Sequence, residues 1–391
     1  MYINFKRFNI SKFSSLSFKL SIFLLPSAFA ISAILMLICL LIRVSESGLK
    51  EIFKDKWNLS LMASLFFMVI SCILNNSLSE DLFLYDIPVE YFKNWSPFFS
   101  WINLLNWGPM FLIFIYFQKY LSTYEDRKIV GKLFILGTIP VLVSGFLQIW
   151  FGIYGPFQIF NGLVIWYQRE WGDYPIFTAM FNNQNYTGSW LNIVWPFVMA
   201  ILLDTKKQIF KRNLIFILSV FTTIAVYATF SRNAYLGYLI STGLILNGKY
   251  SLIYGIIVTF LSIPILLARF NINPVIQEFF QSFIHSKFWN ASNFLNFSNF
   301  LNQIRFNIWE ISAKYILKRP FIGWGASSFP ILFELETLGT SQGNQLHPHN
   351  IFLSLALNYG IIVSLIILSF IIAILLKAFK KYTSILKNEL K

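Results

Sequence analysis

The sequence predicts an all-α, polytopic membrane protein with about ten transmembrane helices and one long outer loop. Of its 391 residues, 56% are hydrophobic and 12% are charged, whereas soluble chains carry roughly 25% charged residues. Several apolar stretches approach the ~20 residues that a helix needs to cross the hydrocarbon core of a bilayer. Lys and Arg lie in short clusters between these stretches. We therefore expect one membrane domain over residues 1–391.

The net charge of +14 is interpreted as the cytoplasmic Lys and Arg of a membrane protein rather than as a nucleic-acid surface. Cys39 and Cys72 both fall within apolar stretches, so we expect neither a disulfide framework nor a thiol–metal site. The sequence has no Gly-rich nucleotide loop, no paired membrane carboxylates and no Asp-x-Asp motif. These absences argue against ATP-driven transport and against metal-dependent transfer from a sugar nucleotide.

The first apolar stretch, 20–42, is flanked by basic residues on both sides, and both flanks are expected in the cytoplasm. A helical hairpin that begins upstream of Lys19 and turns near Pro26-Ser27 satisfies both flanks. A single crossing with the N-terminus outside is the alternative. A cleaved signal peptide is not expected, because the stretch is too long and basic residues follow it instead of a small-residue cleavage site.

Further spans follow from the hydrophobic pattern. They are 57–74, 98–118, 132–150, 188–203, 213–230, 232–248, 251–268 and 360–376. The basic clusters between or after them are 119–132, 206–212, Lys249 and 377–391. These clusters are expected in the cytoplasm, together with the C-terminus. The acidic loop 75–97 and the segments 151–187 and 269–349 then lie on the outer, periplasmic side.

The segment 269–349 is a long outer loop, and loops of this length without a domain of their own are usually functional. Its hydrophobic periodicity predicts a helix over 303–318, which Pro320 ends. A glycine-containing turn over 321–329 follows. A short helix over 350–358 then leads into the last span at Gly360.

Two arginines are candidates for binding an anionic group. Arg232 lies where two apolar runs meet, and a charge at such a position is expensive unless it faces a cavity or the membrane surface. Arg305 lies on the predicted outer helix. A guanidinium fork suits diphosphate and carboxylate groups. The alternatives are an interfacial, snorkelling arginine for Arg232 and a solvated helix face for Arg305.

Two of the three histidines stand in His347-Pro348-His349-Asn350, directly before the last apolar run. Histidine titrates near neutrality, so a pair at a membrane surface indicates proton transfer. The alternative is that the histidines form a polar cap for the helix that starts near Asn350. A metal site would need further ligands, and only Glu334 and Glu336 are near in the sequence, so none is expected.

An amide-rich stretch, Asn182-Asn183-Gln184-Asn185, precedes the span at 188. Amides at a membrane surface suit hydroxyl-rich ligands, which makes Asn182 and Asn185 weak candidates for substrate binding. The same residues also cap helices. Aromatic residues flank the stretch, and an interfacial aromatic belt is favoured for them over sugar-stacking platforms.

Four motifs in this order resemble the O-antigen ligase / O-antigen polymerase superfamily of bacterial membrane proteins. They are FNNQN, TFSRNAYLGYL, RFNIWEISAKYILKRPFIGWGASSF and HPHNIFLSLALNYGIIVSLIIL. Each motif is weak alone, but the ordered set, with the long outer segment before the fourth, is specific. The similarity covers residues 130–376, and the N-terminal spans match in character only.

The resemblance implies a glycosyltransferase of GT-C-type architecture in the bacterial inner membrane, with its active site facing the periplasm. It implies a donor glycan on undecaprenyl diphosphate and an acceptor glycan or lipid core, with no metal and no other cofactor. Arg232 and Arg305 would bind the diphosphate, His349 would be the catalytic histidine and His347 would support it. Asn350, like Asn182 and Asn185, is a weak candidate for substrate binding. Ligase and polymerase share this chemistry, and the sequence does not separate them.

Two other classes of function remain open in the sequence. One is a transporter or channel for a small solute such as inorganic carbon, because members of the same superfamily have been proposed to move it. Against transport, we find no internal repeat and no charged residue deep within a span. The other is a non-catalytic membrane partner of a polysaccharide assembly complex.

Overall fold

The computed structural model describes residues 2–77, 95–170, 175–203, 209–246, 248–269, 273–284, 304–337 and 345–389. Several segments named above lie partly outside the described residues. They are most of loop 75–97, the start of the basic cluster 206–212 (residues 206–208), and the stretches 285–303 and 338–344 of the outer segment. The chain divides into two compact units. Unit 1 comprises Met1–Ser45 and Phe117–Ala291, and unit 2 comprises Glu46–Tyr116 and Ser292–Lys391. A single membrane domain over 1–391 stays a prediction.

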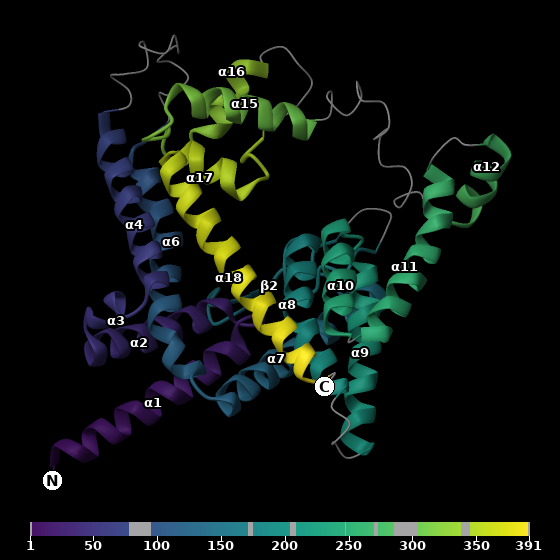
Figure 1. The fold of residues 1–391 in the computed structure, drawn as a ribbon, viewed down its shortest axis with the longest axis horizontal. Coiled ribbons are helices and arrows are strands. Elements are labelled where there is room, and N and C mark those ends of the chain that lie inside the picture. The colour runs from purple at the N-terminus through teal and green to yellow at the C-terminus, as the bar shows by residue number, and fades with distance from the viewer. Residues whose placement is uncertain are drawn as a thin grey trace. The chain divides into compact units, whose positions relative to one another are not determined.

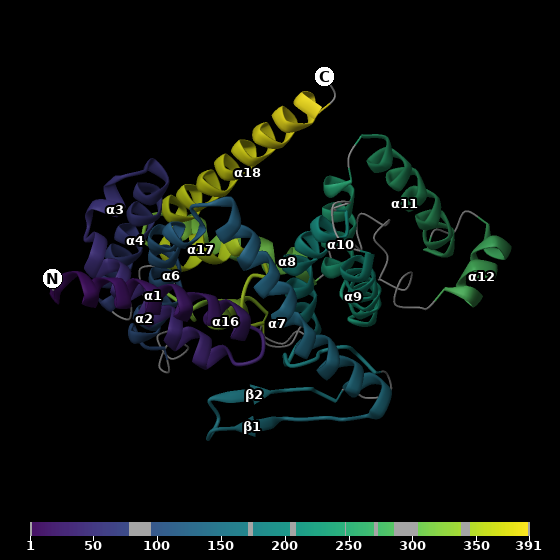
Figure 2. The ribbon, with the colours of Figure 1, turned by 90° about the horizontal axis from the view of Figure 1, so that it is seen from below.

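Unit 1 is a set of helices with one small hairpin of strands (Figures 1 and 2). Its helices are α1 (Tyr2–Leu24), α2 (Phe29–Ser47, which runs into unit 2), α7 (Tyr124–Phe151), α8 (Gln184–Leu202), α9 (Ile209–Ala228), α10 (Arg232–Ile245), α11 (Gly248–Arg269) and α12 (Pro274–Phe283). The 3-10 helix Gln118–Leu121 precedes α7. Helix α8 contacts α7, α9 and α10, so it forms the centre of this unit.

The expected hairpin at the N-terminus is confirmed. Helix α1 ends at Leu24, a turn covers Leu25 to Ser27, and α2 begins at Phe29. The two helices are joined near the turn by a hydrogen bond from the Ser32 hydroxyl to the Ser21 carbonyl, at 2.8 Å. The stretch 20–42 is therefore the end of one helix and the start of the next. Phe29–Ser47 alone is long and apolar enough to cross a membrane, so the alternative of a single crossing with the N-terminus outside stays open.

The segment 151–187 contains an antiparallel pair of strands that the hydropathy pattern does not predict. Strand β1 (Phe157–Ile159) pairs with β2 (Val164–Trp166), with Phe157 opposite Trp166 and Ile159 opposite Val164. The Trp166 indole N–H donates to the Ser27 carbonyl at 2.7 Å. This bond ties the hairpin of strands to the turn between α1 and α2.

Close approach of α8 and α10 depends on two glycines. A Cβ on Gly188 would lie 2.5 Å from the Ala234 Cβ, and a Cβ on Gly237 would meet the Asn192 amide. Small residues allow two helix backbones to pack closely in a membrane protein. The contact sets the start of α10, and hence Arg232, against the start of α8.

Unit 2 contains α3 (Lys50–Phe53), α4 (Lys56–Leu74), the 3-10 helix Asn75–Ser77, α6 (Phe98–Phe117), α15 (Ile304–Lys318), α16 (Phe329–Thr337), α17 (Ile351–Tyr359) and α18 (Ile361–Glu389). The predicted helices over 303–318 and 350–358 are confirmed as α15 and α17. Helix α16, within the outer segment, was not predicted. Ile308, Ile311 and Tyr315 of α15 pack with Trp324 and Leu332 in the core of this unit.

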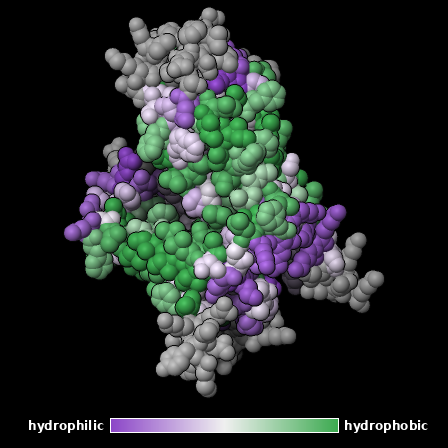
Figure 3. All heavy atoms as spheres, turned by 90° about the vertical axis from the view of Figure 1, so that its left-hand side faces the viewer, coloured by the Kyte–Doolittle hydropathy of each residue, from purple (hydrophilic) through white to green (hydrophobic). Residues whose placement is uncertain are grey.

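Six helical stretches of the described residues are long and apolar enough to cross a membrane. They are Phe29–Ser47, Lys56–Leu74, Phe98–Leu121, Tyr124–Phe151, Lys249–Arg269 and Ile361–Ser384, and Arg212–Ala228 is a shorter apolar helix. The expected span 232–248 is only the 14-residue α10. A polytopic membrane protein is supported by this pattern and by the broadly apolar surface in Figure 3. The number of about ten spans and the GT-C-type architecture stay predictions.

Candidate functional site

The turn before α17 brings the two candidate histidines together, with His349 in an uncommon conformation. His349 is exposed and has a φ of 53°, in the left-handed region. Its backbone N–H donates to Nδ1 of His347 at 3.3 Å, and the two ring centroids are 4.2 Å apart. A positive φ is uncommon for a residue with a Cβ, and such strain gathers at functional sites. The backbone presents His349 at the surface beside its neighbour.

Helix α15 supports this turn and carries Arg305. The Trp309 indole N–H on α15 donates to the Pro348 carbonyl at 3.2 Å. Arg305 is exposed and stands four residues before Trp309, which puts both side chains on one side of the helix. Burial first, and then the positive charges of His347 and Arg305, lower the pKa of His349. The structure therefore brings Arg305 and both histidines together in unit 2.

Asn350 acts as the N-cap of α17. Its side-chain oxygen accepts hydrogen bonds from the backbone N–H groups of Phe352 at 2.9 Å and Leu353 at 3.3 Å. The cap is thus Asn350 itself, and the alternative in which the histidines cap the helix is wrong. These bonds occupy the Asn350 oxygen and anchor the histidine turn to the start of α17.

The predicted glycine turn fixes the end of α15 against the end of α17. Trp324 is fully buried; its backbone N–H donates to the Leu357 carbonyl at 2.7 Å and its indole N–H to the Tyr315 carbonyl at 2.8 Å. After Gly360, the Ile361 N–H donates to the Pro320 carbonyl at 2.7 Å. Because α15 carries Arg305 and α17 follows His349, this turn holds their supporting helices in one arrangement.

Glu336 forms its hydrogen bonds with side chains of α15 and not with the histidines. Its carboxylate accepts from Lys314 Nζ at 2.6 Å and from the Tyr315 hydroxyl at 2.8 Å. Partial burial acts to raise the pKa of Glu336, but these hydrogen bonds and the nearby lysine charges together lower it. Among the described residues, no group of three or more His, Cys, Asp and Glu is arranged to hold a metal ion.

Arg232 begins α10 in unit 1, and a hydrogen bond joins its turn to the amide-rich stretch. Ser231, the N-cap of α10, donates from its hydroxyl to the Asn185 side-chain oxygen at 2.7 Å. Arg232 is exposed. Asn183 caps α8 by accepting from the Asn185 N–H at 2.7 Å, so the capping interpretation holds for Asn183, whereas Asn182 and Asn185 stay exposed.

A buried glutamine holds the stretch before the amides in place. The Gln148 side-chain oxygen accepts from the backbone N–H groups of Thr178 at 3.0 Å and Ala179 at 2.9 Å. Its side-chain nitrogen donates to the Arg169 carbonyl at 2.8 Å. The Thr187 hydroxyl donates to the Thr178 carbonyl at 2.7 Å. Helix α7 thereby positions the start of α8.

Sequence reasoning missed an aromatic pair beside Arg232. The Tyr235 hydroxyl donates to the Tyr227 carbonyl at 2.7 Å, and the two rings lie nearly parallel with centroids 6.3 Å apart. Tyr227 is exposed, and Phe230 between them has a φ of 50°. The sequence signal for this pair is that Tyr227 and Tyr235 each lie four residues from Ser231. The exposed ring of Tyr227 can contact a sugar.

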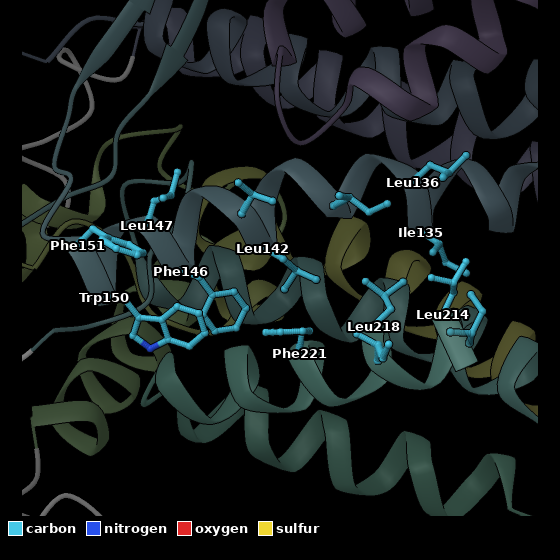
Figure 4. Close-up of a pocket in the computed structure, with 14 residues that line it drawn as sticks. Ile135, Leu136, Leu142, Phe146, Leu147, Trp150, Phe151, Leu214, Leu218 and Phe221 are labelled. Atoms are coloured by element: carbon cyan, nitrogen blue, oxygen red, sulfur yellow. The ribbon is translucent and has the colours of Figure 1, made fainter. Parts of the chain in front are cut away.

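Helices α7 and α9 form an apolar groove of about 610 Å³, shown in Figure 4. Its fourteen lining side chains are all hydrophobic and come from these two helices alone. Phe146 and Phe221 face each other across it with ring centroids 5.3 Å apart. Helix α9 continues for about 10 Å beyond Phe221, and the turn to Arg232 follows. Along the chain, Arg212 precedes the α9 part of the groove and Arg232 follows it.

The candidate residues thus form two clusters. Unit 2 holds Arg305 with the histidine turn and Asn350, and unit 1 holds Arg232 with Asn185 and Asn182. The meeting of the two clusters around one substrate stays a prediction.

Comparison with known proteins points to one family. Residues 214–368 match the family model described as O-antigen ligase. The match begins on α9 and ends on α18, so it includes Arg232, Arg305 and the histidine turn. No curated protein matches the chain.

Proposed function

We propose that the chain transfers a glycan from a lipid diphosphate, because its residues 214–368 match the O-antigen ligase family model. The donor would be a glycan on undecaprenyl diphosphate, and the acceptor a second glycan or a lipid core. The reaction would take place on the periplasmic face of the bacterial inner membrane, with the C-terminus in the cytoplasm.

The observation that carries this proposal is the pairing of Arg305 with His349. The charge of Arg305 acts on His349, and Trp309 holds the histidine turn to the same helix. A fixed cation next to a neutral imidazole is suited to a reaction in which a phosphate leaves and a hydroxyl attacks. The guanidinium stabilises the leaving charge, and the imidazole accepts the proton.

The transfer itself balances without a further reactant. The acceptor hydroxyl oxygen forms a bond to the anomeric carbon of the donor glycan, and the bond from that carbon to the diphosphate oxygen breaks. His349 takes the hydroxyl proton, and the bonding electron pair leaves with the diphosphate, which Arg305 and Arg232 bind. Attack opposite the leaving group inverts the anomeric carbon. Asn182 and Asn185 would contact glycan hydroxyls near Arg232.

The pH dependence of transfer should reflect the lowered pKa of His349. A lowered pKa keeps the imidazole neutral, and hence basic, to more acidic pH. The acid limb of kcat/KM should therefore have its midpoint below about 6.5, the ordinary histidine value. His347→Asn keeps an acceptor for the His349 N–H but removes a positive charge, so it should move this midpoint to higher pH. Profiles of both proteins over the same buffers check this, and a midpoint unchanged by His347→Asn would contradict it.

The apolar groove would receive the polyprenyl tail of the donor. Leu218→Trp fills the groove from α9, whereas Phe216→Trp adds the same ring to an exposed position on α9 that does not line it. We expect Leu218→Trp to raise KM for a long-chain donor several-fold with little change in kcat. The lost contacts would stabilise the bound substrate and the transition state equally. The increase should shrink with a short-chain donor. Equal kinetics of the two variants would contradict a role for the groove.

A transfer assay with purified protein tests the proposed function. The protein is incubated with an undecaprenyl-diphosphate-linked oligosaccharide and several acceptors, with a chelator present. Longer glycan chains would assign a polymerase, and glycan joined to the lipid core would assign a ligase. No transfer to any acceptor by a folded protein would overturn the proposal. The family match gives no support to the alternative of a small-solute transporter, and uptake into proteoliposomes tests that alternative directly.

A further inference from the structure

Helix α12 has a sharply divided surface that the proposed chemistry does not use. Val275, Ile276, Phe279 and Phe283 fall within one arc of this ten-residue helix, and all four are exposed. The other side carries Gln277, Glu278 and Gln281, and Ser282 lies at the edge of the apolar arc. Phe279 is 57% exposed and Phe283 is 75% exposed. A helix of this kind has the composition of one that lies in a membrane interface.

The orientation of α12 is fixed by the end of α11. The Gln281 side chain donates to the Ala268 carbonyl at 2.8 Å, and Gln277 donates to the Ala268 and Arg269 carbonyls at 3.4 and 3.5 Å. These bonds satisfy carbonyl groups that a helix end otherwise leaves without a partner. The polar side of α12 therefore faces α11, and its apolar side points away from it.

Helix α11 has the properties of a lipid-facing span. It has 22 residues, which make about 33 Å of helix. Only 6% of its most apolar stretch is buried within the protein. Its exposed apolar residues include Phe260 and Leu266. It begins beside Lys249, which belongs on the cytoplasmic side, so Arg269 and α12 fall at the opposite surface.

We propose that α12 lies in the outer surface of the bilayer, with Val275, Ile276, Phe279 and Phe283 among the lipid acyl chains. The occupant of this face is lipid because the face continues the exposed apolar surface of α11 at the depth where that span ends. Glu278 would lie on the side that meets water. The helix would thus hold the start of the long outer segment at the membrane surface, whatever chemistry follows it.

Site-directed spin labelling tests this placement. Phe279→Cys and the adjacent Glu278→Cys form a matched pair, because they differ only in the side of α12 that carries the label. The full chain is reconstituted in bilayers of phosphatidylethanolamine and phosphatidylglycerol, and the unsubstituted protein controls for the buried Cys39 and Cys72. We expect the Phe279 label to be more accessible to oxygen, which dissolves in lipid, and the Glu278 label to a water-soluble nickel chelate.

Three results would overturn the proposal. Equal access of the chelate to both labels would mean that the face lies in water. Shielding of the Phe279 label from both reagents would mean that protein covers it, for example residues 285–303 of the same chain. Spin–spin broadening that depends on protein density would mean that a second copy covers it. Phe283→Cys with Glu278→Cys repeats the comparison if Phe279→Cys fails to fold.

Discussion

Replacing His349 by asparagine should lower the rate of glycan transfer roughly 100- to 10,000-fold, the usual contribution of a general base. Asparagine is chosen because it tolerates the left-handed conformation that His349 adopts. It leaves the turn intact but cannot accept the hydroxyl proton near neutral pH. Initial rates with saturating donor and acceptor measure the loss.

The control for this prediction is Leu346→Asn. Leu346 is exposed in the same turn and has no part in the proposed chemistry, so this variant should transfer glycan at the wild-type rate. Both variants should reach the same level in the membrane. A similar loss in both, or a loss in His349→Asn that only follows its protein level, would remove His349 from the mechanism.

Replacing Gly360 by alanine should destabilise unit 2 by about 3 kcal/mol, a value typical of strained backbone combined with steric conflict. Gly360 has a φ of 93°, and an added Cβ would meet the backbone carbonyl of Phe321. Since the backbone fixes the position of a Cβ and the atoms it would meet are backbone atoms of Phe321 and Ile322, a side-chain rotation cannot relieve the conflict. Thermal unfolding in detergent, followed by tryptophan fluorescence, should show a clearly lower midpoint.

Gly255→Ala is the matched control on α11. Nothing lies within 4 Å of a Cβ at Gly255, and alanine favours a helix over glycine, so its midpoint should be equal or slightly higher. Transfer activity should fall only in Gly360→Ala, because Gly360 links the ends of α15 and α17 that support Arg305 and His349. Unfolding of both variants at one temperature would show that this junction tolerates a side chain.

The elements of the outer segment that could be predicted are those whose ends are marked by special residues. Pro320 ends α15 because proline lacks the N–H that a helix interior needs. Asn350 starts α17 because a short amide accepts N–H groups at a helix start. Pro26 marks the turn between α1 and α2. At each of these points, local chemistry and the final structure agree.

Other features depend on contacts between residues that are distant in sequence. The β1–β2 hairpin is held by Trp166 and Ser27, a pairing that no local pattern reveals. The bond between Ser231 and Asn185 and the support of the histidine turn by Trp309 are of the same kind. Arg305 and His349 could be proposed as site residues from the sequence, but their proximity required the fold.

The shortness of α10 has a consequence for the bilayer around it. Helix α10 is not among the candidate spans; as part of the expected span 232–248, its 14 residues would reach about 21 Å, well under the ~30 Å of hydrocarbon in a typical membrane. Hydrophobic mismatch of this kind is relieved by local thinning of the leaflet or by water that reaches the end of the helix. The free-energy cost of this thinning is lowest at the charged end of the helix, because a guanidinium attracts water and headgroups. A depression of the membrane surface at Arg232 would let a lipid-borne diphosphate reach the protein without leaving its own leaflet.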